Sequence, residues 1–224
     1  MNHLHRSTVV FVLVLLLIFL LAGQVLVVPE STVTLTVPAE VPIGEAFTFT
    51  ATFDNTHATD VGYGPFIDVV LPTNGADGLG NTNPPLDGIS YISASYLGFP
   101  VTITVQTFTN APLGVLPCGP TQSTLDHPYA VDTSNVPLPV CGTPGDTLIT
   151  VQLPFGSFSP DQPPAPVEFN VQLSNLADLG TPLTIRARGG YEFGANALDD
   201  FCCDPTILSQ TSPDSSIWSP SADV

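Results

Sequence analysis

The chain has 224 residues, of which 43% are hydrophobic and only 10% are charged. Acidic residues outnumber basic ones by 20 to 3, so the formal net charge is −17, and a surface of this charge repels nucleic-acid phosphates, which excludes binding through a basic patch. The three basic residues are arginines (Arg6, Arg186 and Arg188), and a chain without lysine has no Schiff-base or P-loop chemistry.

Residues 1–28 are predicted to be an export signal. Arg6 precedes an uninterrupted run of apolar and small residues that ends at Ala22, and this order is typical of a secretory signal. Because basic residues stay in the cytoplasm, residues 29–224 are expected outside it, either secreted or at the cell surface.

Cleavage of the signal stays open. A cut after Gly23 would leave Leu21 three residues before the cut, where a small residue is preferred. If the segment is not cut, residues 7–28 are long enough to cross a bilayer core of ~30 Å at ~1.5 Å per residue. A cleaved signal peptide and an uncleaved anchor helix are therefore both open, with membrane contact limited to residues 7–28.

Eight segments beyond residue 29 alternate apolar with polar residues, and a period of two predicts half-buried β-strands. In one of them, Phe47, Phe49 and Phe53 share a face and threonines occupy the other. The predicted strands are residues 31–37, 46–53, 66–71, 88–96, 101–108, 147–153, 167–173 and 183–188.

Strands with one polar face are expected to form antiparallel sheets, and two such sheets bury their apolar faces against each other. The sequence therefore predicts an all-β sandwich domain over residues 29–195. Long connections at 72–87 and 109–146 show no strand periodicity and are expected to be loops. Residues 196–224 lose the alternation and are expected to be a linker or the start of a further module.

Two stretches resemble the conserved repeat domain of large bacterial surface proteins. Residues 41–56 begin Val-Pro-Ile-Gly-Glu and end Asp-Asn-Thr, and residues 67–72 read Ile-Asp-Val-Val-Leu-Pro. The chain departs from this pattern at His57 and in the added Gly-Tyr-Gly-Pro of residues 62–65. The resemblance implies an antiparallel immunoglobulin-like β-sandwich related to adhesion, within a larger multi-module protein, and it carries over no catalytic residue.

Four cysteines in an exported chain favour disulfides. Cys118 and Cys141 bracket a proline-rich stretch and are the favoured pair. The adjacent Cys202 and Cys203 are candidates for a vicinal disulfide, for pairing with the first two, or for free thiols. The spacing of Cys118, His127 and Cys141 does not fit a zinc site.

Oxygen-bearing side chains gather in the first long connection, in a loop rich in glycine. An exported acidic protein meets calcium, which binds six to eight oxygens, although the same residue types also build ordinary turns. The candidate calcium ligands are Asn74, Asp77, Asn81, Asn83 and Asp87. A second acidic cluster comprises Asp199, Asp200 and Asp204.

Five aromatic residues are candidates for a carbohydrate platform, although aromatic positions in strands more often belong to the core. They are Tyr63, Phe66, Tyr91, Tyr96 and Tyr191. The remaining acids are expected to be solvated surface groups.

The expected function is a non-catalytic, exported structural or adhesive module at the cell surface. Its partner is expected to be an unidentified surface molecule or further domains of the same polypeptide, and no resident cofactor is expected, with calcium as the alternative. A calcium- or carbohydrate-binding extracellular module is the alternative, and a secreted hydrolase is a remote one.

Overall fold

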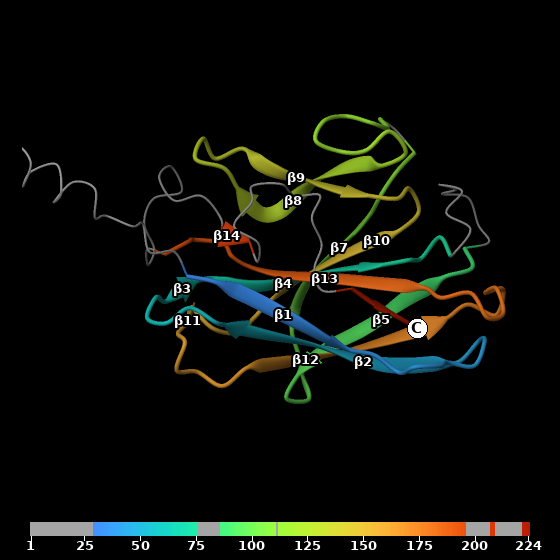
Figure 1. Cartoon of the computed structure of the whole chain (residues 1–224), viewed down its shortest axis with the longest axis horizontal. Helices are drawn as coiled ribbons and strands as arrows, with labels where there is room; N and C mark the ends of the chain where they lie inside the picture. The colour runs from blue at the N-terminus through green and yellow to red at the C-terminus, as the bar shows by residue number, and fades with distance from the viewer. Residues whose placement is uncertain (1–28, 76–85, 111, 196–206, 209–220) are drawn as a thin grey trace, which may run out of the picture.

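The computed structural model describes residues 29–75, 86–110, 112–195, 207–208 and 221–224. All regular structure in these residues is β-strand, and all the strand pairings are antiparallel (Figure 1). The all-β class predicted from the period-two patterns is confirmed. The predicted signal or anchor, residues 1–28, lies outside the described residues. The part of the chain that is described contains no helix with the length and hydropathy needed to cross a membrane.

The first large sheet has five strands. In β12, Val167, Phe169 and Val171 are buried, whereas Glu168 between them is exposed. β-Branched and aromatic residues suit such a pleated, half-buried surface. In spatial order the strands are β1 (Ser31–Thr36), β2 (Ala46–Asn55), β12 (Ala165–Leu173), β5 (Ile89–Tyr96) and β6 (Phe99–Pro100).

The second large sheet has six strands. In order they are β14 (Ile207–Leu208), β13 (Thr184–Tyr191), β4 (Pro65–Leu71), β10 (Thr147–Gln152) and β7 (Thr102–Thr107), with β15 (Ser221–Asp223) also paired to β13. Two small sheets complete the described strands. They pair β3 (Gly62–Tyr63) with β11 (Ser157–Phe158), and β8 (Ser123–Val131) with β9 (Pro137–Gly142).

The main core lies between the two large sheets, and its buried side chains come from both. Within the first sheet, the rings of Phe49 and Phe169 stack at 4.9 Å. Phe53 packs edge-to-face against Tyr191 of the second sheet at 5.5 Å. A Cβ atom at Gly189 would lie 2.8 Å from the Phe53 ring. Glycine at that point of β13 therefore lets the two sheets approach each other.

The eight predicted strands correspond to β1, β2, β4, β5, β7, β10, β12 and β13. The prediction that residues 109–146 form a loop is wrong, because they contain the β8–β9 hairpin. Its prolines explain why the hairpin was not predicted: Pro128 lies within β8, and Pro137 and Pro139 lie within β9. Proline weakens the sequence signal of a strand, and the register of the hairpin also shifts between Asp126 and Val131.

The expectation of one polar, solvated face is wrong for the centre of the second sheet. Every residue of β4 is buried, including Asp68. The second face is covered because the β8–β9 hairpin lies over it (Figure 1). Val140 and Leu125 of the hairpin pack with Val70 of β4. The molecule thus has a third layer that the alternation did not indicate.

The described residues of segment 196–224 belong to the second sheet. β14 pairs with Gly190 and Tyr191, and β15 pairs with residues 184–186 of β13. Beyond β15, Val224 and Leu183 exchange two backbone hydrogen bonds of 3.1 Å. These residues extend the sheet, whereas the sequence assigns them to a linker or a further module.

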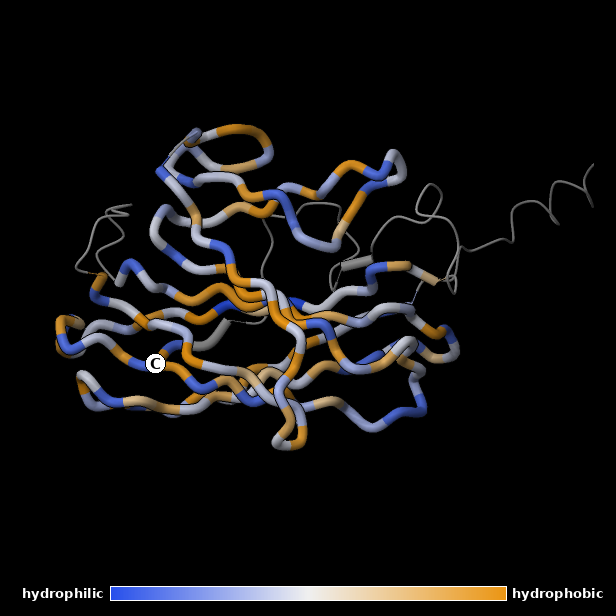
Figure 2. Tube along the Cα trace, turned by 180° about the vertical axis from the view of Figure 1, so that it is seen from behind, coloured by the Kyte–Doolittle hydropathy of each residue, from blue (hydrophilic) through white to orange (hydrophobic). Residues whose placement is uncertain are grey.

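The turn between β5 and β6 projects from the body of the molecule and carries hydrophobic residues (Figure 2). Leu97 and Phe99 are 70% and 75% exposed. Leu97 and Gly98 both have positive φ, of 50° and 80°, as in the tight hairpin turns that asparagine and glycine favour. A leucine in this conformation is strained, and here it is also exposed.

Candidate functional site

A disulfide closes the β8–β9 hairpin and the segment before it, and polar contacts fix the hairpin to the second sheet. Cys118, which precedes β8, is bonded to Cys141 of β9, with their Cα atoms 5.3 Å apart. The structure thus contains the pair favoured by the sequence. Cys202 and Cys203 lie outside the described residues.

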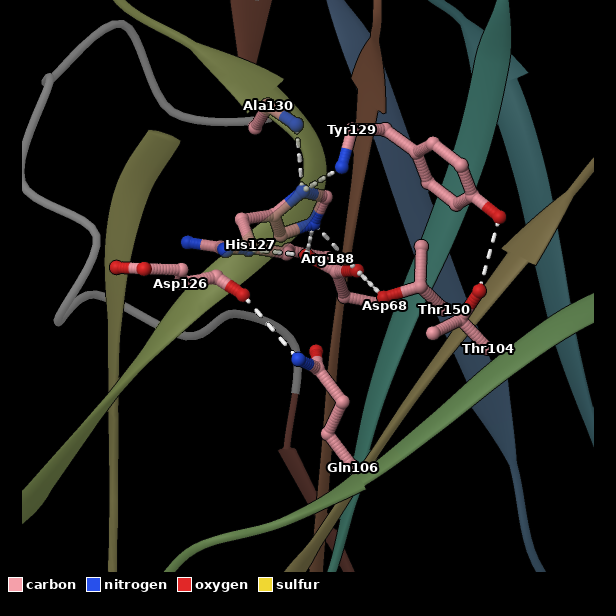
Figure 3. A network of polar contacts seen from close by, with 9 residues as sticks. All are labelled: Asp68, Thr104, Gln106, Asp126, His127, Tyr129, Ala130, Thr150 and Arg188. Carbon is pink, nitrogen blue, oxygen red and sulfur yellow. Dashed lines mark hydrogen bonds and ion pairs between the residues drawn. The ribbon is translucent and has the colours of Figure 1, made fainter. Parts of the chain in front are cut away.

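Asp68 lies at the centre of the interface between hairpin and sheet (Figure 3). Its neighbours Ile67 and Val69 belong to the main core, so the alternation along β4 turns Asp68 toward the hairpin. Thr150 of β10 and Arg188 of β13 are its direct partners in the strand register. The fold therefore aligns a hydroxyl, a carboxylate and a guanidinium in one row across three strands.

The hydroxyl and the guanidinium of this row both donate to the Asp68 carboxylate. Thr150 Oγ1 lies 2.7 Å from Oδ1, and Arg188 Nε lies 2.8 Å from Oδ2. His127 of β8 approaches from the hairpin and places Nε2 2.9 Å from both carboxylate oxygens. We call Asp68, His127, Thr150 and Arg188 the Asp68 network.

Both ring nitrogens of His127 are engaged. Its Nδ1 accepts hydrogen bonds from the backbone N–H groups of Tyr129, at 3.0 Å, and Ala130, at 2.6 Å. Since Nδ1 accepts, Nε2 carries the proton that is donated to Asp68. The hairpin is also held at β7, where Tyr129 Oη bonds Thr104 at 2.9 Å and Gln106 donates to the carbonyl of Asp126.

The Asp68 network is electrostatically balanced. Burial by itself raises the pKa of the Asp68 carboxyl, but the adjacent His127 and Arg188 outweigh that effect and hold the pKa well below its usual range. The expectation of a solvated acid is wrong for Asp68. Thr150 and His127 both donate to the same carboxylate, so within this network the imidazole does not act as a base toward the hydroxyl. The Asp68 network therefore joins the β8–β9 hairpin to the second sheet.

A cleft of about 550 Å³ lies at one end of the second sheet. The cleft is lined by polar, aromatic and apolar residues. The polar ones are Glu192, Gln152, Ser157 and Thr102, and the aromatic ones are Tyr63, Phe155 and Phe193. The others are Pro65, Pro100, Pro154, Gly64, Val101, Leu153 and Gly156. We call it the Glu192 cleft. Its lining comes from β3, β11, the starts of β4 and β7, the ends of β6 and β10, and the residues that follow β10 and β13.

Backbone contacts fix the segment that carries Glu192. The N–H of Glu192 donates to the carbonyl of Gly64 at 2.9 Å, and the N–H of Phe193 donates to that of Tyr63 at 3.1 Å. Gly64 has a φ of 63°, and a Cβ atom there would lie 2.8 Å from the Phe193 ring. A glycine is therefore required at this position for both backbone and packing reasons.

Glu192 is the acidic group of the cleft. Its burial raises the pKa of the carboxyl, opposed by a hydrogen bond from Gln152 and by nearby His127. Gln152 Nε2 donates to Glu192 Oε2 across 3.4 Å. On the aromatic side, Phe155 packs edge-to-face against Tyr96 and Phe158, which fixes its ring. A partly desolvated carboxyl and ordered rings suit recognition of a small polar or cationic group.

Only two of the five candidate calcium ligands lie in described residues. Asn74 is buried, and its backbone N–H donates to Asp146 Oδ1 at 3.4 Å. Asp87 lies against Gly75, where it occupies the space of a Cβ atom. Asp77, Asn81 and Asn83 lie outside the described residues. Within those that are described, no group of three His, Cys, Asp or Glu side chains is placed to hold a metal.

Asp146 is a buried acid that the sequence reasoning did not single out. Burial raises its pKa to about 7, although the N–H of Asn74 and the charge of Arg186 oppose the rise. The residue directly precedes β10, in a Pro-Gly-Asp turn. That turn signal gives no indication of burial, which comes from the tertiary fold.

The candidate carbohydrate residues do not form one platform. Tyr191 is in the main core, Phe66 packs with Ala130 of the hairpin, and Tyr63 lines the Glu192 cleft. Tyr91 and Tyr96 pack against the main core from β5. The second acidic cluster (Asp199, Asp200 and Asp204) lies outside the described residues.

A scan against protein-family models finds no family that matches this chain, and a search of curated proteins finds no relative. Among solved structures, the chain is similar to AvmM, described as catalysing macrocyclization in alchivemycin A biosynthesis. The two share 11% sequence identity over 85% of this chain and 86% of that one, with a TM-score of 0.37. A likeness at this level carries no functional argument. Any argument about function therefore comes from the geometry of the chain itself.

Proposed function

We propose that the protein is a non-catalytic, exported structural or adhesive module at the cell surface, built on an immunoglobulin-like β-sandwich. The observation that carries the proposal is the Asp68 network. It uses the buried acid, base and hydroxyl of β4, β8 and β10 to hold the hairpin on the sheet. Because these groups are bonded to one another across two layers, they make a rigid scaffold that presents loops.

The strand order supports the immunoglobulin-like part of the proposal. The order β1-β2-β12-β5 corresponds to strands A-B-E-D of that fold, and β13 beside β4 corresponds to F beside C. β14 and β15 then take the place of strand G. In this scheme β7, β10 and the β8–β9 hairpin are an insertion between strands D and E. The resemblance of residues 41–72 to bacterial surface repeats points the same way.

Two further features support an exported adhesive role. The Cys118–Cys141 disulfide is typical of oxidising compartments outside the cytoplasm. The projecting turn at Leu97 and Phe99 exposes apolar side chains in a strained conformation, and strain of this kind gathers at binding sites. Together with the apolar segment at the N-terminus, these features favour a secreted or membrane-anchored protein that contacts a partner.

Localisation tests the exported part of the proposal. Full-length protein in a bacterial host is expected in the envelope or medium, accessible to added protease on intact cells. Its Cys118–Cys141 pair is expected to resist a thiol-reactive mass tag until reductant is added. A chain found in the cytosol with both thiols free would refute the proposal.

An activity screen tests the non-catalytic part. Generic glycoside and ester substrates are expected to show no turnover above a heat-denatured sample. Turnover that disappears in the Glu192→Gln variant would instead establish the hydrolase alternative, with the cleft as its active site.

Calcium binding is the second candidate function, because two of the candidate ligands meet in the described part of the first long connection, where Asp87 Oδ1 lies against Gly75, the residue after Asn74. A ligand that binds only the folded state raises the melting temperature. If this candidate holds, millimolar calcium will raise the melting temperature of the wild type but not of Asp87→Asn. Equal melting temperatures with and without calcium would leave Asn74 and Asp87 as ordinary turn residues.

A further inference from the structure

The Glu192 cleft combines three features that act on the same kind of ligand. It places a carboxyl, an aromatic wall and apolar proline walls within one cavity of about 550 Å³. The surrounding protein has a net charge of −17, which attracts cations and raises their local concentration.

The carboxyl is the charged element. Glu192 lies half in the protein, where burial disfavours its ionised form. A cation placed against it would favour the ionised form through a charge-assisted hydrogen bond. The segment that carries Glu192 is fixed by the backbone bonds to Gly64 and Tyr63, so the carboxyl is held in place before a ligand arrives.

The aromatic wall favours a cation over a neutral polar group. Tyr63, Phe155 and Phe193 all line the cavity, and the face of an aromatic ring attracts an ammonium within about 6 Å. Pro65, Pro100 and Pro154 supply apolar walls. Such walls accommodate the methylene stem of a lysine, which packs on apolar surface while its head stays charged.

An ammonium fits the carboxyl better than a guanidinium does. A guanidinium binds best when both carboxylate oxygens face it as a fork. At Glu192, the Gln152 amide donates to Oε2 and competes for that geometry. A compact ammonium needs only one oxygen and can lie over the rings.

A lysine ligand has to come from another protein. The chain contains no lysine at all. Arg188 is bonded to Asp68 inside the Asp68 network, and Arg186 is largely buried beside Asp146. A second copy of the chain therefore offers no lysine side chain to the cleft.

We infer that the Glu192 cleft binds an ammonium group, as carried by a lysine side chain on the surface of a partner protein. The inference rests on the proposed function, because it names the class of partner that the surface module holds. A lysine-rich surface would also be drawn to the acidic module at long range.

The experiment uses the full-length protein and three small probes at pH 8 and low salt. The probes are the N-acetyl, N-methylamide derivatives of lysine, norleucine and arginine, titrated while the backbone amide signals of Gly64, Glu192 and Phe193 are followed by NMR. The lysine probe is expected to shift these signals and to bind at least tenfold more tightly than the uncharged norleucine probe. Its binding is expected to weaken as salt is added.

Two variants and one control locate the site. Glu192→Gln keeps the shape of the side chain, and the lysine probe is expected to bind it at least tenfold more weakly. Gln152→Glu adds a second carboxylate and is expected to bind the probe several-fold more tightly. Glu168→Gln removes an exposed acid from β12, in the other sheet, and is expected to bind as the wild type does.

Several results would overturn the inference. Among them are equal binding of lysine and norleucine probes, tighter binding of the arginine probe, no binding by any probe, and unchanged binding by Glu192→Gln. The localisation test is independent of these titrations. An exported, oxidised protein without lysine preference overturns the cleft assignment alone, whereas a cytosolic protein with free thiols overturns the proposed function.

Discussion

Asp68 shows how much of this molecule depends on single residues in the right register. It stands in the middle of an apolar strand, at a position where a carboxylate is strongly disfavoured without partners. Three donors from three other strands satisfy it. Removing one of these partners would leave a buried charge uncompensated. The free energy of folding lost in that way exceeds the contribution of a surface ion pair several-fold.

Replacing Arg188 with methionine tests this directly. The variant keeps the length of the side chain but leaves Asp68 without its guanidinium. The free energy of unfolding is expected to fall by about 3–5 kcal/mol, as measured by urea denaturation. Glu168→Gln, an exposed change on β12, is the control and is expected to shift stability by no more than about 0.5 kcal/mol. A loss below about 1 kcal/mol for Arg188→Met would mean that the network does not hold the layers together.

Asp146 predicts an unusual pH dependence. Burial raises its pKa from 3.8 to about 7 in the folded protein, so between these values the folded state binds more protons than the unfolded state. Stability is therefore expected to fall as the pH rises from about 4 to 7, by roughly 4 kcal/mol. Asp68 acts in the opposite direction, because its lowered pKa contributes stability that is lost as the pH falls below about 4.

Unfolding free energies measured by denaturant titration at pH 4.5 and 7.5 check the sign. The wild type is expected to be the more stable at pH 4.5, and the difference is expected to shrink sharply in Asp146→Asn. Asp161→Asn, at an exposed position, is the matched control and should keep the wild-type slope. A wild type that gains stability over this interval would show that Asp146 is not protonated in the fold.

At the scale of elements, the β8–β9 hairpin is the part of the fold that needs the most outside support. Its two strands pair only with each other in the sheet topology, and an isolated two-stranded hairpin is marginal in water. Support comes from the disulfide, from small apolar clusters with Val70 and Phe66, and from the Asp68 network. These attachments together replace a core of its own.

Removing the disulfide should therefore loosen the hairpin first. The bridge closes a sequence separation of 23 residues, for which chain entropy gives about 3 kcal/mol. In a variant with Cys118→Ser and Cys141→Ser, hydrogen exchange is expected to accelerate in β8 and β9, while β2 and β12 serve as the internal control. Uniform acceleration in all strands would show that the hairpin and the sandwich unfold as one unit.

The strands and the hairpin differ in how far local sequence could predict them. β2 and β12 were predictable because the alternation of threonine, valine and phenylalanine is a property of each strand alone. β8 carries a proline, and its residues take their burial from contacts with the sheet. The partners of Asp68 lie 59, 82 and 120 residues away in sequence. Such a network requires the sheet register, which no local pattern specifies.

The Glu192 cleft could not be predicted from the sequence for the same reason. Glu192 follows β13 and Gln152 ends β10, and the two meet only because both strands flank β4 in the sheet. Tyr63 was already a candidate from the sequence, but as part of a platform that the fold does not assemble. Glu192 and Gln152 were not singled out from the sequence, because only the topology brings them together beside Tyr63.

For the whole molecule, the dominant physical quantity is its charge. A net charge of −17 on 224 residues favours solubility but destabilises the compact state through self-repulsion. Added salt shortens the screening distance from ~30 Å at 0.01 M to ~3 Å at 1 M. The melting temperature is therefore expected to rise by several degrees between 20 and 500 mM NaCl, as measured by circular dichroism. KCl should give the same rise, and a flat or falling curve would mean that repulsion does not limit stability.

The placement of Arg186 and Arg188 has a consequence for resistance to proteases. Both lie in β13, which pairs with β4 and with the terminal strands, and the chain has no lysine. Trypsin-like enzymes cut after lysine or arginine and need an extended, accessible substrate. Within the described residues, the peptide bonds after Arg186 and Arg188 are therefore held inside a sheet. Digestion at these bonds requires that sheet to open first.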